Sequence, residues 1–244
     1  MAVNHSCPVT AWKILAWSLL GLVLNVLLAW PDTAFRPETV RHPHTRRVLA
    51  DMPPAFGDEP SPKEEWLANY CVEQKALRRR VLVYTSYTGK RDTTARLKAL
   101  LSGRGLKVAV LRASVDTDKR EDWVAEQVDK GVDVLITNPE LVKTGLDLLE
   151  FPSILFLQTG YNVYTLMQAA RRSWRIGQRE DVEVLFLGYR QSSQSQCLAL
   201  MAEKIAVSQS TSGDIPESGL DSLNQRGDSV EMALARQLVL QQAT

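Results

Sequence analysis

Short apolar runs alternate with helical stretches through the middle of the chain. In the helical stretches, apolar residues recur at intervals of three and four, so that one face of each helix is apolar. The runs between them are rich in Val, Leu and Ile, which is typical of strands buried on both faces. The pattern therefore predicts an α/β fold, a parallel sheet with helices on both faces. The predicted strands are 81–85, 108–111, 132–137, 154–157 and 182–187, and the predicted helices are 92–101, 118–130, 163–174 and 191–207.

Functional residues of such a sheet lie on the loops that follow the carboxyl ends of its strands. These loops begin near Thr85, Arg112, Thr137, Gln158 and Gly188. The first continues as Ser86-Tyr87-Thr88-Gly89-Lys90-Arg91, which suggests a phosphate loop. That motif needs a Gly five residues before the second Gly and a Ser or Thr after the Lys. Tyr84 and Arg91 stand there instead, which leaves a solvated turn or a contact with backbone phosphates of a nucleic acid.

Residues 14–30 are almost wholly apolar and predict an N-terminal helix. A bilayer span needs about 20 apolar residues, with a lower limit near 17. Lys13 and the flanking Trp12 and Trp30 suit a membrane anchor. The other interpretation, a buried helix, is favoured here over the membrane.

Composition divides the chain into three parts. Residues 1–65 hold the apolar helix and then a Pro- and Arg-rich linker; its basic positions, from Arg36 to Arg47, are interpreted as solvated, with nucleic-acid contact as the alternative. Residues 66–207 hold the predicted sheet. Residues 208–244 are predicted to be a flexible tail with a short helix.

The formal net charge of +1 excludes a globally basic nucleic-acid binder, so any such role needs a local patch. The cysteines, Cys7, Cys71 and Cys197, form no CxxC pair. They predict reduced thiols in a cytoplasmic protein. All three histidines precede residue 45, so we predict no metal site.

The string QAARRSWRIGQ at 168–178 carries the strongest chemical signal. On a helix, Gln168, Arg172 and Arg175 would share one face because they are spaced by four and three. Two guanidinium groups on one face suit a polyphosphate, since each makes bidentate and permanently charged contacts with phosphate oxygens. A surface ion pair is the less specific alternative.

This string resembles the last motif of superfamily 2 helicases, in the form Q-A-x-x-R-x-x-R-I-G-Q of Swi/Snf-type DNA translocases. The segment Gly145-Leu146-Asp147-Leu148 is similar to the G-L-N-L part of the preceding motif. Asn162 stands where that family has the Asn of its W-N-P turn. The resemblance runs from about Val81 to Tyr189 and implies a single RecA-like lobe, the helicase C-terminal lobe.

The resemblance also implies roles for individual residues. Arg172 and Arg175 would be catalytic arginine fingers, which stabilise charge on the transferred phosphoryl group. Gln168, Gly145 and Asp147 would contact the nucleotide, ATP with Mg²⁺. Backbone phosphates of DNA would be contacted by Thr85, Ser86 and Thr137.

The sequence contains neither G-x-x-x-x-G-K-[ST] nor D-E-x-[HD], the motifs with which the first lobe of such an enzyme binds ATP and Mg²⁺. We therefore expect no useful ATP hydrolysis by this chain alone, and a first lobe as partner, in trans or in a full-length protein. Two alternatives remain: a non-catalytic module that binds DNA or protein, and a membrane-anchored α/β protein.

Overall fold

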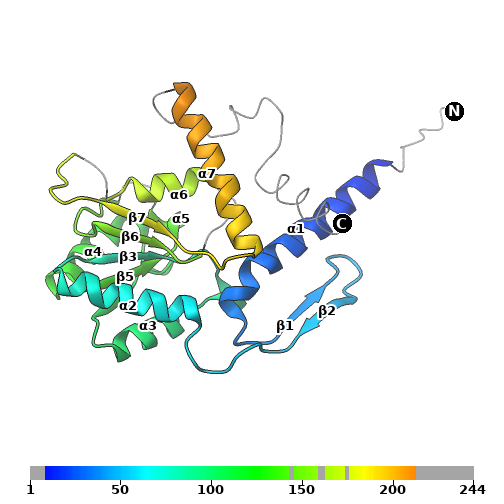
Figure 1. The fold of residues 1–244 in the computed structure, drawn as a ribbon, viewed down its shortest axis with the longest axis horizontal. Helices are drawn as coiled ribbons and strands as arrows, with labels where there is room; N and C mark the ends of the chain where they lie inside the picture. The colour runs from blue at the N-terminus through cyan, green and yellow to red at the C-terminus, as the bar shows by residue number, and fades with distance from the viewer. Residues whose placement is uncertain (1–8, 143–145, 159–162, 174–175, 213–244) are drawn as a thin grey trace.

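A computed structural model describes residues 9–142, 146–158, 163–173 and 176–212 of the chain. Its centre is a five-stranded sheet formed by β3 (Val81–Tyr84), β4 (Val108–Val110), β5 (Val134–Thr137), β6 (Ser153–Phe156) and β7 (Glu183–Phe186) (Figure 1). All strand pairs are parallel, in the order β4-β5-β3-β6-β7. The structure confirms the predicted α/β fold and each of the five predicted strands.

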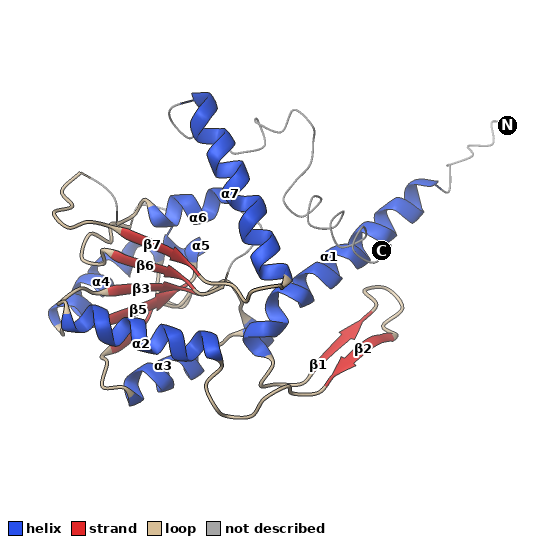
Figure 2. Cartoon of the chain, viewed as in Figure 1, coloured by secondary structure: helices blue, strands red, loops and turns tan. Residues whose placement is uncertain are grey.

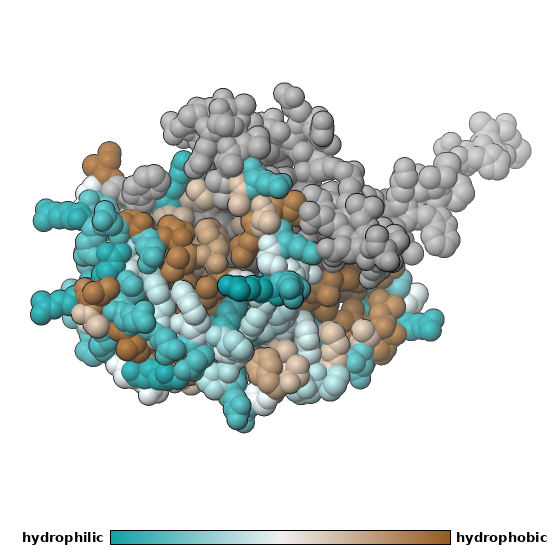
Figure 3. All heavy atoms as spheres, in the orientation of Figure 1, coloured by the Kyte–Doolittle hydropathy of each residue, from teal (hydrophilic) through white to brown (hydrophobic). Residues whose placement is uncertain are grey.

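Burial follows position in the sheet. Every residue of β3, β5 and β6 is buried, as the uninterrupted apolar runs predicted. The edge strand β7 is more exposed, because only one of its long sides is paired. Figure 3 shows hydrophobic residues (brown) interspersed with hydrophilic ones (teal) on the face in view.

Helices cover both faces of the sheet. Helices α2 (Pro62–Ala76) and α3 (Thr94–Gly103) pack against the face that contains Val81 and Val83. The alternate residues Leu82 and Tyr84 point into a second cluster on the other face. That cluster is covered by α4 (Arg120–Asp129), α5 (Pro139–Val142), α6 (Val163–Ala170), α7 (Ser193–Ser212) and α1 (Val9–Thr33). Figure 2 shows α2 and α3 on one side of the sheet, with α6 and α7 on the other.

Local sequence signals explain where these helices begin and end. The hydroxyl of Ser61 accepts a hydrogen bond from Glu64 N, and the Glu64 carboxylate accepts one from Ser61 N, which is a capping box at the start of α2. Gly105 and Gly131 follow α3 and α4 with φ of 77° and 74°. Both belong to Schellman motifs, since the next residue donates to the carbonyl five positions earlier. Short 3₁₀ helices, η1 (Gly89–Arg91) and η2 (Thr117–Lys119), follow β3 and β4.

Residues 31–65 contain secondary structure that the linker prediction did not include. Strands β1 (Glu38–Arg41) and β2 (Val48–Met52) form an antiparallel hairpin. In Figure 1 the hairpin lies beside α1, outside the central sheet. The Phe35 ring before it is flanked by the guanidinium groups of Arg36 and Arg96, 4.7 Å and 4.3 Å from its centroid.

Helix α1 includes the apolar N-terminal stretch. Its Leu24 and Leu28 are buried in the same cluster as Cys197 and Met201 of α7. Within the part of the chain that the structure describes, no helix is long and apolar enough to cross a membrane.

Candidate functional site

The loops that follow β3 and β5 meet at the carboxyl edge of the sheet. Thr85 N donates to Thr137 O over 2.9 Å, so two of the predicted nucleic-acid residues lie side by side. Both are nearly buried, and the Thr137 hydroxyl already donates to Leu111 O. Both threonines form part of the wall of the cleft described below.

Gln158, the residue after β6, holds the loop after β3 in place. Its Oε1 accepts hydrogen bonds from Ser86 N and Tyr87 N, both over 3.1 Å, and its Nε2 donates to Thr93 Oγ1. The Ser86 hydroxyl donates in turn to Gln158 O. Gln158 is 1% exposed, so it positions the loop and does not face solvent. Sequence analysis placed a loop here but assigned Gln158 no role; the signal was an amide side chain directly after an apolar strand.

A cleft of about 640 Å³ opens beside these loops. Thr85, Ser86 and Thr137, which were predicted to contact DNA, all line it. On the other side, Arg112 donates to Asp92 Oδ2 and to Thr94 Oγ1. Burial would raise the pKa of the Asp92 carboxyl, but hydrogen bonds from Thr94 and the charge of Arg112 outweigh it, and the pKa lies below its usual value. The cleft thus carries hydroxyls, an amide and a partly exposed guanidinium, contributed by Ser86, Thr88, Ser114, Asn138 and Arg112.

The arginine motif lies in a second place, at the end of α6. Leu148 N donates to Arg172 O over 3.1 Å, which brings the neighbouring Asp147 next to the motif. The Tyr84 hydroxyl donates to Ala169 O and ties β3 to the same helix end. Arg172 is 7% exposed, whereas Asp147 is exposed. Burial raises the pKa of Tyr84 well above its usual range, and the nearby Arg172 charge partly opposes that shift.

The helix that carries this motif is shorter than predicted. It ends at Ala170, whereas the periodicity indicated a helix through residue 174. Arg172 N and Ser173 N donate to carbonyls three positions earlier, so the chain tightens into a turn. Arg172 therefore follows the helix, and its position is set by this turn and by Leu148. The half-buried Gln168 remains on α6.

Other predicted residues fall outside the described part of the chain. These are Gly145, Arg175 and Asn162. Among the described residues, no group of three or more His, Cys, Asp or Glu side chains is placed to hold a metal ion.

Comparisons with known proteins match the central part of the chain. Residues 62–177 match the family model described as the helicase conserved C-terminal domain. The fold is similar to the crystal structure of the C-terminal part of the Fun30 ATPase domain, with a TM-score of 0.56 and 20% sequence identity. That likeness covers 75% of this chain and 57% of the other, so this chain matches little more than half of that structure's length. No curated protein matches the sequence.

Proposed function

We propose that residues 62–177, which match the helicase conserved C-terminal domain, are a helicase C-terminal lobe and that the chain acts as the second lobe of an ATP-dependent DNA translocase of the Swi/Snf type. In this proposal a first lobe, supplied in trans or by a longer protein, binds ATP and Mg²⁺. The lobe described here completes the nucleotide site and holds DNA.

The hydrogen bond from Leu148 N to Arg172 O carries the nucleotide part of the proposal. It joins two segments that each resemble a helicase motif and that lie far apart in sequence. In the proposal, Arg172 and Arg175 act as arginine fingers, and Gln168, Gly145 and Asp147 contact the nucleotide. Fixed cations next to the transferred phosphoryl group stabilise the charge that develops there.

The cleft at the carboxyl edge supports the nucleic-acid part. Its hydroxyls and amide suit the oxygens of a phosphodiester backbone, and such contacts position a protein on DNA without reading its sequence. Ser86 and Asn138 are joined by a hydrogen bond from Asn138 Nδ2 to Ser86 O, so the two loops form one surface. In the proposal, DNA lies against this surface, with Thr85, Ser86 and Thr137 on its wall.

Burial of Arg172 favours a second candidate, a non-catalytic module that binds DNA or protein. A finger must reach the nucleotide, but Arg172 is only 7% exposed. The translocase proposal therefore requires the Arg172 side chain to move outward when a first lobe docks. In the second candidate, it stays beside Tyr84 as part of the core.

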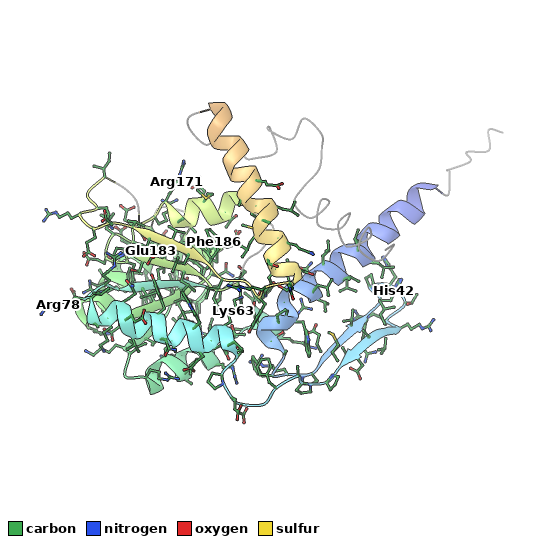
Figure 4. The ribbon with its side chains drawn as sticks, viewed as in Figure 1. His42, Lys63, Arg78, Arg171, Glu183 and Phe186 are labelled. Carbon is green, nitrogen blue, oxygen red and sulfur yellow. The ribbon has the colours of Figure 1, made fainter. Side chains whose placement is uncertain are left out.

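DNA-stimulated ATP turnover separates the two candidates. It is measured for the chain alone, for a first lobe alone, and for their mixture. Arg171→Ala is the matched control, because Arg171 precedes Arg172 and points away from the sheet (Figure 4). We expect turnover only in the mixture, with a loss of about a thousandfold or more in Arg172→Ala and in Arg175→Ala.

Three results would count against the translocase. Equal turnover in the Arg172→Ala, Arg175→Ala and Arg171→Ala mixtures would remove the finger role. DNA binding without turnover in any mixture would support the non-catalytic module. Turnover by the chain alone would contradict the requirement for a first lobe.

A further inference from the structure

A second cavity, of about 910 Å³, lies between the β1–β2 hairpin and the η1 turn after β3. Its walls carry five basic side chains and one acidic side chain, Glu38. Since the net charge of the whole chain is only +1, this is a local concentration of positive charge. The basic residues are Arg36, Arg41, Arg46, Lys90 and Arg91.

Two of these arginines build the cavity. The Arg36 guanidinium donates to Lys90 O over 2.9 Å and to Asp92 O over 3.2 Å. Arg91 pairs with Glu38, with 2.6 Å between Nη2 and Oε1, so the single carboxylate of the cavity is already neutralised. These contacts fasten the hairpin to the helicase lobe, although the hairpin lies outside the matched residues 62–177.

The other three basic residues are exposed: Arg41, Arg46 and Lys90. Arg41 Nη1 makes one long contact, 3.5 Å, with Arg46 O. They come from β1, from the hairpin loop and from η1, so their charges converge from separate elements on one space. Like charges held together in this way repel one another, and an anion in the cavity relieves the repulsion.

The cavity adjoins the cleft at the carboxyl edge, because Thr88 lines both. A polyanion that lies along the cleft therefore continues across Thr88 to the basic residues. Duplex DNA presents about one negative charge per 1.7 Å of its length, which matches cations spread over a wide cavity better than a single phosphate does.

We infer that the cavity between the hairpin and η1, with Arg41, Arg46 and Lys90, binds the phosphate backbone of duplex DNA and extends the track beyond the helicase lobe. The inference rests on the proposed function for the presence of DNA. It favours nucleic-acid contact, the alternative given above for the basic positions from Arg36 to Arg47, over a solvated linker. Because the contacts are with phosphates, they add affinity without sequence preference.

The test compares two triple variants of the full chain in binding a fluorescein-labelled DNA duplex across a salt series. One is Arg41→Gln, Arg46→Asn, Lys90→Gln. The other removes the same charge elsewhere: Arg78→Asn, Lys98→Gln, Lys130→Gln. Arg46 and Arg78 have φ of 60° and 58°, a left-handed conformation that Asn tolerates, so the two Asn substitutions are matched. Figure 4 shows Arg78 at the opposite end of the molecule from His42 on the hairpin loop.

We expect the cavity variant to bind about tenfold or more weakly at low salt. The slope of log affinity against log salt should become shallower by about two to three, since each lost phosphate contact removes about 0.9. The control variant should retain the slope of the original chain. Thermal unfolding of both triple variants checks that the chain remains folded. A single Lys90→Gln variant tests the charge with a substitution that lies outside the hairpin.

The outcomes separate this inference from the proposed function. An unchanged slope in the cavity variant overturns the inference but leaves DNA binding at the cleft. An equal loss in both variants also overturns it, because net charge alone would explain the loss. If the cavity variant keeps its DNA binding and loses only its association with a first lobe, the cavity binds protein and the inference is overturned. If the original chain does not bind DNA, the inference and the DNA part of the proposed function both fail.

Discussion

Lys63 Nζ lies 2.8 Å from Asp32 Oδ1, and each side chain is only 6% exposed. Gln194 Nε2 donates to Asp32 Oδ2, and Gln194 Oε1 accepts from Lys63, so α1, α2 and α7 are joined at one point (Figure 4). Burial raises the pKa of Asp32 and lowers that of Lys63, because each charge loses water; their mutual attraction opposes both shifts.

Breaking this pair on one side should strongly destabilise the chain. Lys63→Met leaves the Asp32 carboxylate buried without its cation, and we expect a loss of about 3–5 kcal/mol in the free energy of unfolding in urea. The double variant Asp32→Asn, Lys63→Met removes both charges and should recover most of the loss. A single variant as stable as the original chain would show that the pair contributes nothing.

Gln158 is expected to control the shape of the loop that lines the cleft. Gln158→Leu leaves Ser86 N and Tyr87 N without their shared acceptor, and we expect a loss of about 2 kcal/mol in urea unfolding together with weaker DNA binding. Thr93→Val removes only the partner of Gln158 Nε2, leaves the acceptor of Ser86 N and Tyr87 N in place and serves as the matched variant; its loss should be smaller because one hydrogen bond is lost instead of three. Equal losses in the two variants would contradict the role of the acceptor.

The hydrogen bond from Tyr84 to Ala169 should contribute modestly to the position of the arginine motif. Tyr84→Phe keeps the buried ring and removes only the hydroxyl, and Ala169 O still accepts from Arg172 N. We expect a loss of about 1 kcal/mol in unfolding free energy. Tyr87→Phe, which removes a hydroxyl from the loop after β3, is the comparison variant. A Tyr84→Phe chain with undiminished stability would show that this bond does not hold the helix end.

The thiols Cys71 and Cys197 should be inert in the folded chain. Burial raises the pKa of Cys71 to about 12 and that of Cys197 to about 11, from an ordinary value of 9.0. The folded chain therefore holds these protons more tightly than the unfolded chain. The resulting stability is fully present below pH 9 and is lost as the pH rises towards those values.

Thiol labelling with a disulfide reagent at mildly alkaline pH tests this directly. In a Cys7→Ser background, we expect Cys71 and Cys197 to react only after denaturant is added, because the thiolate is the reactive form. Single Cys71→Ala and Cys197→Ala variants assign each reaction. Rapid labelling of either thiol without denaturant would contradict the burial described here.

The central fold was predictable because its signal is local. Five apolar runs and the helices between them recur in the structure within a few residues of their predicted bounds. The end of α6 was not predictable in this way. Periodicity continued to residue 174, but 3₁₀-type bonds and the contact between Leu148 and Arg172 end the helix at Ala170.

The β1–β2 hairpin was missed for a related reason. Residues 38–52 are polar and interrupted by proline and histidine, which reads as a solvated linker. Pairing between the strands, together with the contacts of Arg36 and Arg91 with distant residues, gives the segment its structure. The local pattern of residues does not indicate any of these contacts.

The sequence by itself determined the strands, the parallel sheet and the resemblance of the string at 168–178 to a helicase motif, because each depends on residues close together along the chain. Only the tertiary structure decided which distant residues meet: Thr85 with Thr137, Arg172 with Leu148, and the basic hairpin with the loop after β3. The physical reason is that such contacts depend on how strands are ordered and helices packed, and the spacing of residues along the chain does not record that order.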